Sequence, residues 1–172
     1  DNYINAPFSK IEECSSNILT YINSGTAVFG GKVSKEFKDE CKKKDIDIVD
    51  YLDREEFGIL NGIPTAEGAI EIALREKATT IWKSKCLISG FGKIAWPLSK
   101  LLTAMGADVE ILTHSNKSSS LASACGYKTI TSSELKEHIG KYDIVFNTAP
   151  SIIFTSDVLK NAHRECIFID LA

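Results

Sequence analysis

Short apolar runs alternate with longer amphipathic stretches along most of this chain. In its larger part, the alternation predicts strands at 86–89, 108–113, 128–130, 142–147 and 166–171, with helices at 93–105, 118–124, 132–139 and 155–161. Strands and helices that alternate in this way are joined by right-handed crossovers, which place helices on both faces of one sheet. We therefore expect an α/β fold with a doubly wound parallel sheet over residues 81–172.

The amino-terminal part of the chain contains one further unit of the same kind. A strand at 26–29, a helix at 34–44 and a strand at 46–50 form a single βαβ module. A weak helical pattern between Phe8 and Ile22 precedes this module. One βαβ module cannot cover both faces of a parallel sheet, so we predict that residues 1–62 are part of a larger domain.

A helix is predicted to join these two parts. Residues 61–64, Asn-Gly-Ile-Pro, favour a break in the chain, and Pro64 suits the first turn of a helix that continues to about Ala78. One side of this helix carries an apolar stripe of Ala66, Ala69, Ile70, Ala73 and Leu74. We interpret residues 63–80 as an interdomain helix.

A candidate binding motif follows the first strand of the larger part. Gly90, Gly92 and Ala95 form Gly-x-Gly-x-x-Ala after an apolar run and before a helical pattern. The first glycine permits a tight turn, the second lets the backbone approach a pyrophosphate, and the small third residue lets helix and strand pack closely. This context indicates a Rossmann-like dinucleotide-binding domain, although a purely structural glycine turn is the alternative. We expect these residues to hold the cofactor: Gly90, Phe91, Gly92, Lys93 and Ile94.

The residues after the second strand of this motif indicate which dinucleotide is bound. An acidic side chain here would accept hydrogen bonds from the ribose of NAD and would repel the 2′-phosphate of NADP. The chain has donors instead, in Thr113, His114, Ser115, Asn116 and Lys117. We therefore predict NADP, with NAD as the second choice. Two alternatives stay open, namely that Glu110 is the acidic residue, or that this segment is only a polar turn.

Two other strands end in polar residues at the same predicted edge of the sheet. The strand at 142–147 runs into Asn147, Thr148, Ala149 and Pro150, which we predict to contact the nicotinamide ribose. A simple turn ending in proline is an equal alternative for this segment. Asp170, at the end of the last strand, lies either near the nicotinamide or merely at a strand end.

The composition narrows the classes of function. Of the 172 residues, 44% are hydrophobic and 25% are charged, as in ordinary globular domains, and no apolar run is long enough to span a bilayer. A formal net charge of -3 disfavours a nucleic-acid partner. Five cysteines without a Cys-x-x-Cys pair argue against a disulfide framework and a zinc site. We expect a cytoplasmic protein without a metal, in which Cys86 and Cys166 act as small hydrophobic residues.

Four blocks of sequence together resemble one protein family. These are Asn61 to Ile70, Gly90 to Lys93, Asn147 to Pro150 and Ile169 to Ala172. In their order and spacing they resemble the A subunit of dipicolinate synthase, and Pro-Thr-Ala-Glu-Gly at 64–68 is the distinctive part. The resemblance runs from about Thr26 onward. It implies a protein similar to 2-hydroxyacid dehydrogenases, in which a partial flavodoxin-like substrate domain is joined by long helices to an NAD(P)-binding domain.

The resemblance also implies an activity and a partner. That family acts with a second (B) subunit to turn a hydroxy-tetrahydrodipicolinate, a small dicarboxylate, into dipicolinate for spores, which implies an NADP-dependent oxidoreductase. The competing hypotheses are another NAD(P)-dependent 2-hydroxyacid or shikimate-type dehydrogenase, or a nucleotide-binding module without catalysis. We expect no membrane partner, and homo-oligomerisation stays open.

The candidate catalytic residues are Thr65 and Glu67, because a helix that begins at Pro64 would direct its first amides toward an anionic substrate. Glu67 would repel carboxylates, so we assign it proton transfer, with stabilisation of the helix dipole as an equal alternative.

The chain departs from the family pattern in two respects. Where the family has Arg after the second strand, this chain has His114, which carries a positive charge only when it is protonated. The chain also begins at Asp1 and ends on an apolar strand. We therefore expect a segment truncated at both ends, whose nucleotide domain is incomplete at the carboxyl terminus and which is inactive alone.

Overall fold

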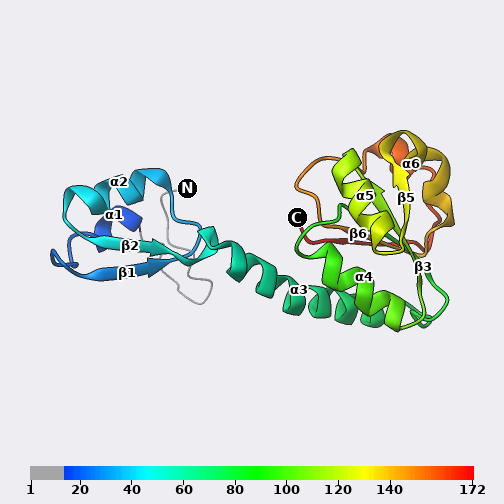
Figure 1. Ribbon diagram of the computed structural model, residues 1–172, viewed down its shortest axis with the longest axis horizontal. Coiled ribbons are helices and arrows are strands. Elements are labelled where there is room, and N and C mark those ends of the chain that lie inside the picture. Colours follow the sequence, from blue (N-terminus) through cyan, green and yellow to red (C-terminus); the bar gives the residue numbers. More distant parts are fainter. Residues whose placement is uncertain (1–13) are drawn as a thin grey trace. The chain divides into compact units, whose positions relative to one another are not determined.

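A computed structural model describes residues 14–172 (Figure 1). The chain divides into two compact units after Gly58, and the second unit is Ile59–Ala172. The predicted domain limits at residues 62 and 80 stay a prediction. Of the helical pattern expected between Phe8 and Ile22, the part before residue 14 lies outside the described residues, and the rest contributes a short helix, α1 (Ser15–Ile18).

The first unit contains the predicted βαβ module. Strands β1 (Ala27–Gly30) and β2 (Asp47–Asp50) pair in parallel, with helix α2 (Lys35–Lys43) between them. Ser34 caps α2 by accepting a hydrogen bond from the amide of Phe37. A short 3-10 helix, η1 (Tyr51–Asp53), follows β2. A small apolar cluster fills the space under α2: Leu19, Cys41, Ile46, Val28 and Ile48.

The second unit is built on a parallel sheet whose strands have the order β5-β4-β3-β6-β7. The strand order reverses at β3, which pairs with β4 on one side and with β6 on the other. Ligands of doubly wound folds bind at this switch point, outside the carboxyl ends of the strands. The predicted strands are confirmed with the following bounds: β3 (Lys85–Ser89), β4 (Asp108–Thr113), β5 (Lys128–Thr131), β6 (Ile144–Asn147) and β7 (Ile167–Asp170).

Helices cover both faces of this sheet, as expected for a doubly wound fold. Successive side chains of a strand point to opposite faces, so Cys86 and Ile88 join one apolar core while Leu87 joins the other. Helices of the first core are α3 (Glu55–Glu76), α4 (Ala95–Ala104) and α5 (Asn116–Ala124). Helices of the second core are α6 (Ser132–His138), η2 (Ile139–Lys141) and α7 (Ser156–Leu159). Within residues 14–172, no helix is both long and apolar enough to cross a bilayer.

Helix α3 differs from its sequence-based prediction. It begins at Glu55, so Pro64 lies inside the helix and the predicted break at 61–64 is wrong. Pro64 has no amide hydrogen to donate within the helix. Burial of the small side chains that follow it, Ala66, Ala69 and Ala73, stabilises the continuous helix. The stripe prediction is also wrong for Leu74, which is 50% exposed.

Candidate nucleotide-binding site

The turn between β3 and α4 requires glycine at its first position. Gly90 has φ +88°, a conformation that residues with a side chain rarely adopt. Its amide donates a hydrogen bond of 2.8 Å to the carbonyl of Leu112 on the neighbouring strand. A Cβ atom at Gly90 would lie 3.3 Å from the hydroxyl oxygen of Thr148. The first glycine of the motif therefore holds the turn against the ends of two adjacent strands.

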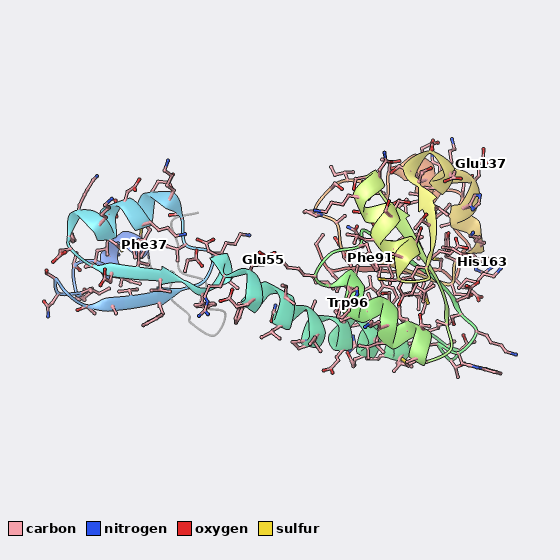
Figure 2. All side chains as sticks on the ribbon, in the orientation of Figure 1. Phe37, Glu55, Phe91, Trp96, Glu137 and His163 are labelled. Atoms are coloured by element: carbon pink, nitrogen blue, oxygen red, sulfur yellow. The ribbon has the colours of Figure 1, made fainter. Side chains whose placement is uncertain are left out.

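The second glycine of the motif faces open space. A Cβ atom at Gly92 would have no atom within 4 Å, and both Gly92 and Lys93 are exposed. The helical hydrogen bonds start at the carbonyl of Gly92, which accepts from the amide of Trp96 at 3.0 Å. Trp96, labelled in Figure 2, lies in the first turn of α4. Among residues 14–172, no acceptor takes the amides of Lys93 and Ile94. Free amides at the start of an α-helix favour anions, so this side of the turn suits a phosphate group.

Two other residues of the motif, Phe91 and Ala95, pack against the core. The ring of Phe91 packs 5.8 Å from the ring of Tyr127, measured between centroids, so only its backbone is available at the turn. Ala95 is fully buried in the core shared by α3 and α4. A small third residue thus permits close packing behind the turn.

The loop after β6 is tied to the end of β3. The amide and the hydroxyl of Thr148 both donate to the carbonyl of Ser89, at 3.2 and 2.7 Å. Asn147 donates from Nδ2 to Asp170 Oδ1 at 3.0 Å, and the two residues pair as the last positions of β6 and β7. The predicted ligands Asn147, Thr148, Ala149 and Pro150 therefore lie at the switch point beside Gly90. Pairing of Asn147 with Asp170 had no signal in the sequence beyond their shared position at strand ends.

The segment after β4 presents most, but not all, of its predicted donors. Thr113 is buried, and its hydroxyl faces the carbonyl of Ile130 at 3.5 Å, so only its backbone remains available. His114, Ser115, Asn116 and Lys117 are exposed. Ser115 caps α5 by accepting a hydrogen bond from the amide of Ser118 at 3.2 Å. The segment carries no carboxylate and includes the first residues of α5. The start of a helix favours an anion.

Glu110 is not available to bind a ribose. Its carboxylate accepts a hydrogen bond from the hydroxyl of Tyr142 at 2.6 Å and pairs with Lys141 at 2.8 Å. The side chain is only 13% exposed and precedes the end of β4. Burial acts to raise the pKa of Glu110, but the bonds from Lys141 and Tyr142 outweigh it and hold the pKa below its usual range. The alternative that Glu110 is the acidic residue at the strand end is therefore wrong.

Replacing Glu110 with glutamine should weaken folding without changing the preference between NADP and NAD. A depressed pKa in the folded state contributes stability above the pKa of the unfolded chain, about 4.3, and this stability is lost as the pH falls. We expect Glu110→Gln to lower the free energy of unfolding at neutral pH by about 1–3 kcal/mol. Urea unfolding from about pH 7 to about pH 3 should also show that the free energy of unfolding falls less steeply with decreasing pH in Glu110→Gln than in wild type. The exposed Glu137→Gln is the control, and identical pH profiles for wild type and Glu110→Gln would contradict the prediction.

The two candidate catalytic residues lie along α3 and not at its start. Thr65 donates from its hydroxyl to the carbonyl of Asn61 at 2.7 Å, and Glu67 is exposed. The helix begins at Glu55, well before Thr65. The expectation that the first amides of the helix lie beside Thr65 and Glu67 and attract an anionic substrate is therefore wrong. Their catalytic roles stay a prediction.

The thiols of Cys86 and Cys166 are poor nucleophiles. Burial raises the pKa of Cys86 to about 12 and that of Cys166 to about 11. Cys86 is fully buried in β3, and Cys166 is half-buried just before β7. Both thiols therefore stay protonated near neutral pH, which supports their interpretation as small hydrophobic residues.

A doubly wound parallel sheet with a glycine turn at its switch point defines this chain as a Rossmann-type α/β protein. No family model matches the sequence. The chain is similar to the A subunit of dipicolinate synthase from Bacillus subtilis (strain 168), with 31% identity over 133 residues, or 77% of this chain and 44% of the relative. The resemblance seen in the four sequence blocks is thus confirmed.

Two solved structures agree with this similarity. The crystal structure of the dipicolinate synthase A chain from Bacillus subtilis matches with a TM-score of 0.83 and 26% identity, over 99% of this chain and 58% of that one. The corresponding protein from Bacillus halodurans matches with a TM-score of 0.85 and 23% identity, over 99% and 59%, and supports the fold alone. The chain therefore spans roughly half of the length of these relatives.

Proposed function

We propose that this chain is the NADP-binding part of an oxidoreductase that acts as the A subunit of dipicolinate synthase. The proposal rests mainly on one observation: the turn at Gly90 and Gly92 is open at the switch point, and the neighbouring strand β4 ends without a carboxylate. Similarity to the A subunit of dipicolinate synthase supports the choice among the many enzymes that share such a turn.

The described residues divide among the parts of the cofactor. The backbone from Gly90 to Ile94 holds the pyrophosphate, because the amides of Lys93 and Ile94 are free and Gly92 leaves room. The 2′-phosphate is bound by the side chains of His114, Ser115, Asn116 and Lys117, with Thr113 contributing its backbone only. The nicotinamide ribose lies against Asn147, Thr148, Ala149 and Pro150.

The reaction removes water from a hydroxy-tetrahydrodipicolinate and then a hydride and a proton, which leaves the aromatic dipicolinate. NADP supplies the hydride acceptor when it is bound. Within this chain, the half-buried Thr65 contacts the dicarboxylate and the exposed Glu67 transfers a proton, both from α3. A second (B) subunit completes the synthase, which acts in the cytoplasm of a spore-forming cell.

Calorimetric titration of the chain with NADP and NAD tests the cofactor. We expect NADP to bind at least about tenfold more tightly, since one charge-assisted hydrogen bond is worth about 1.5–3 kcal/mol. Equal affinities would remove the assignment of the 2′-phosphate, and binding of neither nucleotide would overturn the proposed function.

The substrate is tested on the protein extended to the length of its relatives and mixed with a B subunit. Adding hydroxy-tetrahydrodipicolinate and NADP should increase the absorbance of the reduced nicotinamide. If a 2-hydroxyacid or a shikimate-type substrate gives this signal and hydroxy-tetrahydrodipicolinate does not, the chain belongs to another NAD(P)-dependent dehydrogenase. Nucleotide binding without turnover of any of these substrates would identify a module that binds without catalysis.

A further inference from the structure

Helix α3 contacts the glycine turn through backbone atoms on both sides. Gly62 is buried in α3, and a Cβ atom added to it would collide with the carbonyl oxygen of Lys93. The same Cβ atom would lie 2.9 Å from the carbonyl carbon of Lys93 and 3.5 Å from the amide nitrogen of Ile94. These three atoms belong to a single peptide group. The backbone of α3 therefore packs directly against the peptide that joins Lys93 to Ile94.

Helix formation does not explain a glycine at this position. Glycine inside a helix costs up to about 1 kcal/mol relative to alanine. The neighbouring buried positions of α3, Ala66 and Ala69, carry methyl groups, whereas a methyl group at Gly62 would meet backbone atoms of the turn. Gly68 lies in the same helix, but a Cβ atom there would meet no atom within 4 Å. The bare backbone at Gly62 is thus required by the neighbouring turn.

The contact determines the direction of an amide that the turn presents. A peptide group is planar and trans, so its carbonyl and its N–H point in opposite directions. The carbonyl oxygen of Lys93 is the atom nearest to the added Cβ at Gly62, so it points toward α3. The N–H of Ile94 therefore points away from α3, and no acceptor among residues 14–172 takes it.

We propose that Gly62 is a positioning residue for nucleotide binding, because its lack of a side chain lets α3 support the Lys93–Ile94 peptide and direct the Ile94 amide at a phosphate. This proposal rests on the proposed nucleotide function and adds a residue outside the glycine motif. A methyl group at position 62 must push the peptide outward or rotate it, since backbone atoms cannot move aside as a side chain does.

The test compares Gly62→Ala with Gly68→Ala, which adds the same methyl group to the same helix. NADP affinity is measured by calorimetry below the melting temperature of each variant, so that only folded protein is compared. We expect Gly62→Ala to raise the Kd for NADP at least about tenfold, since displacing a binding group by about 1 Å has effects of this size or larger. Gly68→Ala should bind NADP as wild type does. An unchanged Kd for Gly62→Ala would overturn the proposal.

Hydrogen exchange on the wild-type chain gives a second measurement, needed if Gly62→Ala does not fold. Saturating NADP should slow amide exchange in residues 59–66 together with residues 92–96, while residues 70–76 exchange as before. Unchanged exchange at 59–66, with slower exchange at 92–96, would overturn the inference and leave the proposed function intact. If wild type and Gly68→Ala bind neither NADP nor NAD, the proposed function and this inference both fail.

Discussion

Replacing Gly92 with aspartate is expected to abolish nucleotide binding while the protein stays folded. A Cβ atom at this position meets no atom within 4 Å, so the fold has room for the new side chain. The carboxylate would lie at the start of α4, next to the free amides of Lys93 and Ile94, and would occupy their anion-binding side. We expect the Kd for NADP to rise more than about a hundredfold, or about 2.7 kcal/mol of binding free energy, as measured by calorimetry.

The neutral variants Gly92→Asn and Gly92→Ala separate charge from bulk. Asparagine has almost the same shape as aspartate, so it should lose affinity through steric exclusion but not through repulsion. Alanine should have the smallest effect of the three. Thermal unfolding without nucleotide should give nearly the same Tm for all of them. Wild-type affinity in Gly92→Asp would show that no phosphate approaches this turn.

Replacing Ser115 with aspartate should shift the preference from NADP toward NAD. Ser115 is the N-cap of α5, and aspartate caps helices as well as serine does, so the helix should keep its stability. The new carboxylate would repel a 2′-phosphate and would accept hydrogen bonds from the hydroxyls of the NAD ribose. We expect NADP affinity to fall at least about tenfold while NAD affinity holds or rises, because one such charge-assisted bond is worth about 1.5–3 kcal/mol.

Ser115→Asn is the matched control, because asparagine also caps the helix but carries no charge. It should keep the preference for NADP, and both variants should unfold near the wild-type temperature. Titration of each variant with both nucleotides measures the ratio of affinities directly. If Ser115→Asp lowers the two affinities equally, the 2′-phosphate does not lie at the start of α5.

The sheet of the second unit could be predicted from the sequence because its signals are local. Except for β5, the strands are short apolar runs bounded by turn residues, and β3 to β7 lie where the alternating pattern predicts them. The glycine turn is equally local, since the positive φ at Gly90 depends on a sharp change of direction after β3.

Helix α3 shows where local signals fail. Asn61, Gly62 and Pro64 each disfavour a helix interior, yet the helix continues through them. Burial of Ala66, Ala69 and Ala73 in the core of the second unit outweighs those local costs. The same error misplaced the start of the helix and, with it, the argument for Thr65 and Glu67.

The pattern of the sequence by itself determined the order of strands and helices, the glycine turn, and the absence of a carboxylate between Thr113 and Lys117. These features depend on residues that are neighbours along the chain. Only the tertiary structure decided that Tyr142 and Lys141 contact Glu110 and that the backbone at Gly62 packs against the Lys93–Ile94 peptide. Those contacts join segments that are distant along the chain, and they exist only because the packing of the sheet and its helices brings those segments together.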